Sequence, residues 1–179
     1  MQFRLETERL VLRAMQEEDV DHLLRIFSDP VAMRHYPGLI DPAGTRAWIQ
    51  RTQSNYRRYG FGFWVVERKA DRAFLGQCGI IPQTVDGTVQ PEVAYLFVRD
   101  FWGQGYATEA AKACRDWGFE HLDVPRLISI ISPANVPSIH VAERNGMKPV
   151  STLMRPTGIL HDVYAITRTD WLLLRESRA

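Results

Sequence analysis

One short segment, from residue 92 to residue 110, constrains this chain more than any other part of it. The run Glu92-Val-Ala-Tyr-Leu-Phe-Val98 has the length of a strand and leads into the glycine-rich turn Arg99-Asp-Phe-Trp-Gly103-Gln-Gly105. Small apolar residues then recur at helical spacing to about Glu120. A strand, a turn of exposed backbone N–H groups and a helix N-terminus in succession can bind an anion. We therefore expect this turn to lie open to an anionic ligand.

The turn differs from two familiar nucleotide-binding motifs. It has no Lys-Ser/Thr pair, which a P-loop uses to contact the γ-phosphate and magnesium, and it does not match G-x-G-x-x-G. A pyrophosphate held by the backbone alone is the functional interpretation that remains. A tight turn with no ligand is the structural alternative.

The other patterns predict a mixed α/β architecture on one sheet. A strand at 9–15 precedes two helices, and three strands then form a meander with a hairpin turn at Asp86-Gly87. The strand at 126–131 (Arg-Leu-Ile-Ser-Ile-Ile) is rich in apolar residues, as buried parallel strands are. The expected strands are 9–15, 61–68, 74–82, 89–98, 126–131, 147–155 and 160–168. The expected helices are 20–27, 42–58, 107–120 and 135–145, with a turn at 156–158 and a helical turn in 170–178.

Length and composition narrow the class of protein. The 179 residues suit one domain spanning 1–179, and 45% hydrophobic and 24% charged residues are globular values. A net charge of +1 argues against binding to nucleic acid or anionic membrane through bulk charge. No apolar run has the length of a membrane helix or the pattern of a signal peptide. Two cysteines suit a reducing compartment. We expect a cytoplasmic protein with no nucleic-acid or membrane partner.

Four motifs in order resemble the GNAT superfamily of acyl-CoA N-acyltransferases, and within it the ribosomal-protein N-terminal (Rim-type) branch. The family's phosphate motif, Arg/Gln-x-x-Gly-x-Gly/Ala, reads Trp102-Gly-Gln-Gly105-Tyr-Ala107 here. Trp102 departs from the usual Arg or Gln, which affects a side-chain contact to phosphate but not the backbone contacts. Asn135-Val-Pro-Ser138 with Ala142-Glu-Arg-Asn-Gly146-Met147 resembles the family's Asn-x-x-Ser helix. The opening Thr7-Glu-Arg-Leu-Val-Leu-Arg13 and the closing Asp162-Val-Tyr-Ala-Ile166 also resemble this branch.

The resemblance implies a GNAT fold, with a mostly antiparallel sheet splayed at the cofactor site and helices on both faces. It implies acetyl-CoA as cosubstrate without a metal, and direct acetyl transfer to a protein N-terminus or a small-molecule amine, by a monomer or a homodimer. The backbone of one turn would hold the pyrophosphate, and a strand edge would pair with the pantetheine and polarise the carbonyl. The implied cofactor-binding residues are Phe97, Val98, Gly103, Gln104, Gly105, Tyr106, Ala107, Thr108, Asn135 and Ser138.

Three residues are candidates for proton transfer. Glu92 is the expected base, because a carboxylate among apolar neighbours has a raised pKa; the alternatives are an exposed strand end or an anchor for the acceptor ammonium. Ser138 is the first choice of acid, and its alternative is a helix cap. Tyr164 is the second choice, and its alternative is packing on the sheet.

Several other groups have an expected place. The five histidines show no ligand spacing, so we expect no metal site. Cys114 is expected in the core, and a nucleophilic role for Cys78 is not expected. Loops 35–41 and 85–89 would set acceptor specificity. The candidates for the acceptor pocket wall, each with plain core as its alternative, are Tyr36, Trp48, Phe63 and Trp64.

Two rival functions remain open at this level. The first is a non-catalytic acyl-CoA-binding or sensor protein that keeps the cleft without the chemistry. The second is an unrelated nucleotide-binding module that uses the glycine turn alone.

Overall fold

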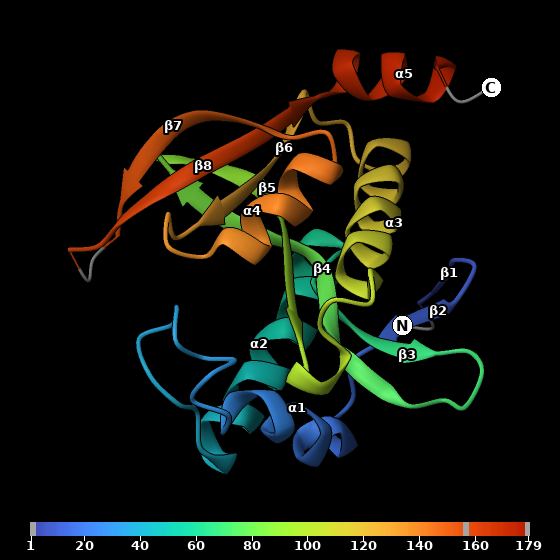
Figure 1. Ribbon diagram of the computed structural model, residues 1–179, viewed down its shortest axis with the longest axis vertical. Helices are drawn as coiled ribbons and strands as arrows, with labels where there is room; N and C mark the ends of the chain where they lie inside the picture. Colours follow the sequence, from blue (N-terminus) through green and yellow to red (C-terminus); the bar gives the residue numbers. More distant parts are fainter. Residues whose placement is uncertain (1–2, 156–157, 178–179) are drawn as a thin grey trace.

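The computed structural model describes residues 3–155 and 158–177, and it contains one eight-stranded sheet with helices on both faces (Figure 1). The strand order is β1-β2-β3-β4-β5-β6-β8-β7. The strands are β1 (Arg4–Glu6), β2 (Leu10–Ala14), β3 (Phe63–Arg68), β4 (Phe74–Val85), β5 (Thr88–Phe97), β6 (Arg126–Ile131), β7 (Lys148–Met154) and β8 (Leu160–Thr167). The helices are α1 (Val20–Phe27), α2 (Pro42–Tyr59), α3 (Tyr106–His121), α4 (Val136–Arg144) and α5 (Arg168–Glu176), with 3-10 turns η1 (Glu17–Asp19) and η2 (Arg99–Phe101). Within the described ranges, no helix is both long and apolar enough to cross a membrane.

The predicted hairpin between β4 and β5 is confirmed. Val85 pairs with Thr88, and the two residues between them, Asp86 and Gly87, have φ of 50° and 75°. Positive φ at both positions is the geometry of a type I′ turn, which Asp-Gly favours. The predicted turn at 156–158 includes Pro156 and Thr157, which lie outside the described residues.

Two elements differ from the sequence-based prediction, and a third, predicted to be parallel, is parallel to only one of its neighbours. β1 was not expected and pairs antiparallel with β2. The C-terminal segment forms the nine-residue helix α5 rather than a single turn. β6 is parallel to β5 but antiparallel to β8. Its apolar sequence therefore reports burial on both faces and says little about strand direction.

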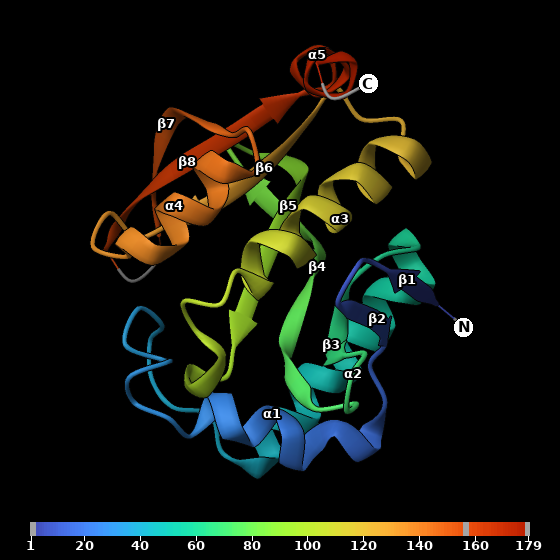
Figure 2. The same cartoon turned by 45° about the vertical axis from the view of Figure 1, so that its right-hand side comes forward.

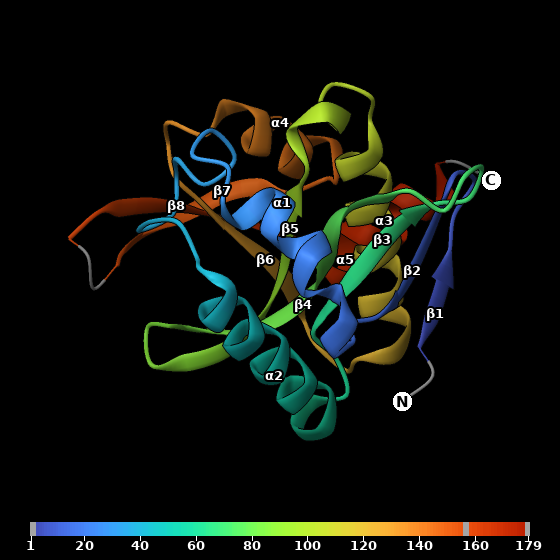
Figure 3. The same cartoon turned by 90° about the horizontal axis from the view of Figure 1, so that it is seen from below.

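Two consecutive residues of β4 show which helix covers which face of the sheet. Gln77 Oε1 accepts the indole N–H of Trp48, from α2, at 3.1 Å. The neighbouring Cys78 Sγ lies 3.5 Å from Cys114 Sγ of α3. Because successive strand side chains point to opposite faces, α2 and α3 lie on opposite sides of the sheet. α1 packs with α2 in front of the sheet in Figure 3, and α4 packs with α3.

β5 and β6 are joined at one end only. Their parallel register records the pair Glu92 and Ile128. Beyond it two side chains bridge the gap: Ser129 Oγ donates to the Val93 carbonyl at 2.7 Å, and the Ile130 N–H donates to the Glu92 carboxylate at 2.9 Å. From there the strands diverge (Figure 2). The expected splay of the sheet is therefore present beside the C-terminal half of β5.

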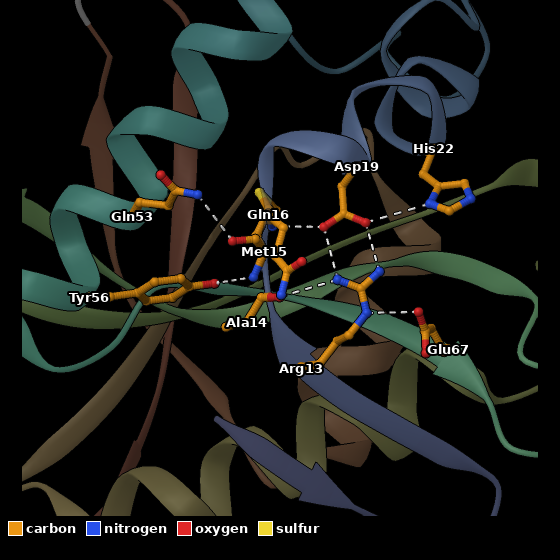
Figure 4. A network of polar contacts seen from close by, with 9 residues as sticks. All are labelled: Arg13, Ala14, Met15, Gln16, Asp19, His22, Gln53, Tyr56 and Glu67. Atoms are coloured by element: carbon orange, nitrogen blue, oxygen red, sulfur yellow. Dashed lines mark hydrogen bonds and ion pairs between the residues drawn. The ribbon is translucent and has the colours of Figure 1, made fainter. Parts of the chain in front are cut away.

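A network of charges holds the start of α1 against β2 and β3 (Figure 4). Arg13 donates two hydrogen bonds to Asp19, at 2.7 and 2.9 Å, and a third to Glu67 at 2.8 Å. Asp19 also accepts the Gln16 N–H at 2.8 Å. Burial alone would raise the pKa of the Asp19 carboxyl, but the hydrogen bonds from Arg13 and Gln16 outweigh burial and lower it. The network therefore keeps Asp19 ionised and fixes the approach of the chain to α1.

Candidate functional site

The glycine-rich turn before α3 leaves its backbone free to bind a ligand. Gly103 and Gly105 have φ of 75° and 81°, in the left-handed region that glycine tolerates best. Gly105 is the N-cap of α3, and no side chain among the described residues caps that helix. A Cβ at Gly103 would meet no atom of those residues within 4 Å. The turn N–H groups and the positive end of the helix dipole are thus arranged as an anion site requires.

Glu109, in the first turn of α3, ties this turn to the start of the chain. Its carboxylate accepts hydrogen bonds from the Thr7 hydroxyl at 2.5 Å, the Arg9 N–H at 2.9 Å and the Arg9 guanidinium at 2.7 Å. Arg9 also donates to the Gln104 carbonyl at 3.1 Å. The opening motif and the glycine turn, distant in sequence, therefore form one structural unit.

A cleft of about 1050 Å³ lies over the turn, between α3, α4, β5 and the loop after α1; we call it the large cleft. Of the six predicted turn residues, Gln104 alone is absent from its lining, because the Gln104 side chain is turned back to the Asp100 carbonyl at 3.1 Å. Basic side chains of Arg34, Lys112 and Arg144 also line it. Open backbone N–H groups and basic side chains fit a cosubstrate with several phosphates.

The two residues expected at the strand edge differ in what they offer. The N–H of Val98 donates to the Leu75 carbonyl at 2.9 Å, and Val98 is absent from the lining of the large cleft. In an antiparallel pair, alternate residues direct their N–H groups toward and away from the partner strand. The N–H of Phe97 therefore points away from β4, toward the splay, and Phe97 lines the large cleft. The backbone contact expected from Val98 is corrected, because its donor is already bonded.

The N-terminus of α4 closes the large cleft opposite the splayed strand. The Asn135 side chain accepts the Ser138 N–H at 3.4 Å and caps the helix, as its position in the sequence predicts. The hydroxyl of Tyr95 donates to the Ser138 carbonyl at 2.8 Å. Tyr95 thereby fixes the first turn of α4 against β5.

A second cavity, of about 480 Å³, adjoins the large cleft; we call it the small cavity. It runs from the β5–β6 gap to the loop after α1 and the end of β7. The two cavities share six residues, which mark the passage between them. The shared residues are Arg34, His35, Tyr36, Tyr95, Asn135 and Ser138.

Glu92 lines the small cavity and is 5% exposed. Burial raises the pKa of its carboxyl to about 7, although the Ile130 N–H, Arg155 and Gln83 each oppose the rise. A carboxyl with this pKa exchanges a proton near neutral pH. Glu92 is therefore buried, and the exposed strand end considered as an alternative does not describe it.

Other predicted residues divide between the cavities and the core. Tyr36, Trp48 and Phe63 line the small cavity. Trp64, one residue after Phe63, points to the opposite face and stacks on Phe3 at 4.0 Å between ring centroids. Trp64 is thus a core residue and not part of the pocket wall.

Tyr164 and the two cysteines lie elsewhere. Tyr164 is 6% exposed on β8, packs in the core, and is absent from the lining of both cavities. Cys78 and Cys114 are fully buried as free thiols between β4 and α3. The structure therefore does not bring Tyr164 together with Glu92 and Ser138.

Sequence reasoning missed several residues of the small cavity. His35, Tyr36 and Pro37 confirm that the loop after α1 contributes to it, but residues 85–89 are absent from its lining. Tyr95 was open to prediction, since it lies on β5 between residues already chosen. Arg155 and His161 carried no local signal, because only the tertiary fold brings the β7–β8 end to this site.

Comparisons with known proteins agree on one family. The family model described as "Acetyltransferase (GNAT) domain" matches residues 9–148. The protein YkkB of Bacillus subtilis is 41% identical over 153 residues, 85% of this chain and 89% of YkkB. The crystal structure of an acetyltransferase from Agrobacterium tumefaciens is similar with a TM-score of 0.79 and 30% identity, over 93% of this chain and 95% of that one. RimL, a ribosomal L7/L12 α-N-protein acetyltransferase solved with coenzyme A, shares the fold with a TM-score of 0.74 at 19% identity, over 92% of this chain and 98% of that one.

Proposed function

The chain belongs to the GNAT acetyltransferase family and is an acetyl-CoA-dependent acyltransferase, and from that premise we propose that it transfers acetyl directly to a primary amine at the passage between its two cavities. In this proposal the large cleft holds acetyl-CoA and the small cavity holds the acceptor. The observation that carries it is the position of Glu92. A buried carboxyl with a pKa near 7 lines the small cavity, and Ser138 lines both cavities.

Glu92 acts as the general base. The acceptor amine must lose a proton, because an ammonium has no lone pair with which to attack the thioester carbonyl. The Glu92 carboxylate takes that proton, directly or through one water molecule. The alternative role, an anchor for the ammonium, uses the same carboxylate and differs in its effect on turnover.

The edge of β5 stabilises the oxyanion, and the N-terminus of α4 assists the departure of the thiolate. The N–H of Phe97, directed into the splay, donates to the thioester oxygen as negative charge develops there. The C–S bond then breaks as the carbonyl re-forms. The nitrogen loses its second proton, which passes through the Ser138 hydroxyl to the departing CoA thiolate, or goes to solvent while the α4 dipole stabilises the thiolate. Tyr164 remains a second candidate only if the acceptor complex brings it to the passage.

We further propose which branch of the family the enzyme belongs to and which amines it accepts. The likeness to RimL, together with the Asn135–Ser138 motif, supports a Rim-type enzyme. RimL is by its name a protein α-N-acetyltransferase, which supports a peptide N-terminus as one class of acceptor. Small-molecule amines are the other class, and the same transfer chemistry serves both.

The proposal is tested by thiol release from acetyl-CoA in the presence of peptide and small-molecule amines, with the acetylated product identified by mass spectrometry. We expect amine-dependent thiol release. Tight CoA binding without turnover on any amine would instead identify a sensor protein. Stabilisation by ATP and not by CoA in a thermal-shift assay would identify an unrelated nucleotide-binding module.

A matched pair of glycine variants tests whether acetyl-CoA binds at the turn before α3. Gly103 and Gly87 both have φ of 75°, and a Cβ at either would lie in open space, but only Gly103 lines the large cleft. Alanine at either site costs about 1 kcal/mol of stability through backbone strain. We expect G103A alone to raise KM for acetyl-CoA, by about fivefold or more. Equal KM values in G103A and G87A would place the phosphates elsewhere.

A further inference from the structure

The small cavity carries more positive than negative charge. Its basic lining consists of Arg34, His35, Arg155 and His161, and Glu92 is the one carboxyl among its lining residues; the remaining titratable groups there are the hydroxyls of Tyr36 and Tyr95. Arg34 and His35 come from the loop after α1, whereas Arg155 and His161 come from the end of β7 and the start of β8. Two segments far apart in the sequence thus place their cations in one cavity.

The described residues leave the charges of these two arginines without a neutralising carboxylate. Within residues 3–155 and 158–177, no carboxylate forms an ion pair with the guanidinium of Arg34 or of Arg155. Arg34 donates to Nε2 of His35 at 3.0 Å, so His35 accepts with a neutral ring. Burial and the positive charges of Arg34 and His161 also lower the pKa of His35. The arginines are therefore the permanent charges of the cavity.

Their position relative to Glu92 is constrained. Arg155 is close enough to Glu92 to oppose the rise in the pKa of that carboxyl, and both act on the hydroxyl of Tyr36. His161 similarly acts on His35, which places the two contributing segments beside each other (Figure 2). The cavity therefore has a buried carboxyl with the Arg155 guanidinium acting on it, and Arg34 lines the same cavity.

This charge distribution discriminates among amines. An acceptor bearing only an ammonium group is attracted by Glu92 but repelled by two unpaired guanidinium groups. An acceptor that also carries a carboxylate satisfies both, because guanidinium binds carboxylate through paired, charge-assisted hydrogen bonds. A cavity of about 480 Å³ is of a size that holds a small ligand.

We propose that the acceptor carries a carboxylate close to its reactive primary amine, and that Arg155 determines this specificity. The inference rests on the proposed acetyl transfer. Arg155 is the better marker of the two arginines, because it lines the small cavity alone, whereas Arg34 also lines the large cleft. Two sources share this chemistry: the α-carboxylate of a free amino acid and the acidic side chain of a peptide's first residue.

The test is a steady-state comparison of matched acceptors at saturating acetyl-CoA. One arm compares free α-amino acids with their α-amides, and the other compares Glu-Ala-amide with Gln-Ala-amide. We expect kcat/KM to favour the carboxylate partner by about tenfold or more in at least one arm. The arm that shows the preference identifies the source of the carboxylate. The amine of an α-amide is less basic than that of the free amino acid, so a larger fraction of the amide is in the reactive free-amine form. A preference for the amino acid therefore cannot come from its free-amine fraction.

Variants at the cavity edge assign the effect to Arg155. R155Q should bring the acid-to-amide ratio to within about twofold without changing KM for acetyl-CoA, and R155K should retain part of the ratio. The control is R57Q, because Arg57 is an exposed arginine of α2 that lines neither cavity. An unchanged ratio in R155Q would overturn the role of Arg155.

Two further outcomes separate this inference from the proposed function. Equal or better turnover of the amides by the unsubstituted enzyme would overturn the inference and leave acetyl transfer intact. If no acceptor is turned over, the proposed function fails, and thermal-shift assays with CoA present test the inference separately. Stabilisation of the protein by the carboxylate acceptors and not by their amides would support the inference. Equal shifts would overturn the inference.

Discussion

Two carboxyls in this protein, Asp19 and Glu92, are buried to nearly the same extent, but their pKa values are shifted in opposite directions. Asp19 is 3% exposed and Glu92 is 5% exposed. Asp19 has a guanidinium in bidentate contact at 2.7 and 2.9 Å, and its pKa is lowered. Glu92 accepts the Ile130 N–H at 2.9 Å and interacts with Gln83 and Arg155, but burial outweighs all three and its pKa rises to about 7.

The difference shows that burial by itself does not decide the charge of a carboxyl. Desolvation favours the neutral form in both cases, and the partner determines the result. Arg13 fixes Asp19 in one charge state, which suits a structural anchor for α1 (Figure 4). Glu92 is left able to exchange a proton, which suits a base.

The largest expected effect concerns catalysis at Glu92. E92Q keeps an acceptor for the Ile130 N–H but cannot take a proton, so kcat should fall by about 10²- to 10⁴-fold. Thiol release measures the fall, and KM for acetyl-CoA serves as the control because Glu92 is absent from the large cleft's lining. In the unsubstituted enzyme, log kcat should rise with pH up to about 7 and then level off, since only the carboxylate is active. A rise in KM for the acceptor with kcat preserved would make Glu92 an anchor.

The corresponding change at Asp19 should affect stability and not turnover. D19N leaves the buried side of Arg13 without its anion, and we expect a loss of about 3 kcal/mol in the free energy of unfolding at pH 7. Because the folded-state pKa of Asp19 is lowered, its stabilisation is present above the unfolded-state pKa and is lost as pH falls through the folded value. Urea titrations at pH 7 and pH 3 measure this difference. A kcat reduced by more than about threefold in folded D19N would link the network to catalysis.

A smaller effect of opposite sign is expected for the stability of E92Q. The pKa of Glu92 is raised on folding from 4.5 to about 7, so the stability linked to its protonation is present below about pH 4.5 and is lost as pH rises through 7. Removing the charge should therefore stabilise the fold at pH 8, on the order of 1–3 kcal/mol, and by little at pH 4.5. Thermal unfolding of E92Q and the unsubstituted protein at both pH values tests this. A pH-independent difference would show that folding does not raise the pKa of Glu92.

Local sequence was sufficient for one of the two cavities. The segment from Tyr95 to Thr108, together with Asn135 and Ser138, supplies most of the groups that line the large cleft. Backbone N–H groups, a helix N-terminus and glycines at positive φ are properties of consecutive residues, so they can be predicted without the fold. The strand and helix ranges were predictable for the same reason, since hydrophobic periodicity is local.

The tertiary structure decided what the sequence left open. Which way an apolar strand runs, as in β6, depends on its neighbours, and the bond between the Val98 N–H and the Leu75 carbonyl depends on strand register. The acidity of Glu92 follows from burial by segments far away in the sequence, and Arg155 reaches it only through the β7–β8 hairpin. Electrostatic interactions depend on distance and desolvation, which only the packed fold specifies. The sequence by itself therefore determined a turn suited to a phosphate-bearing cosubstrate, and the fold determined the electrostatic environment of the small cavity.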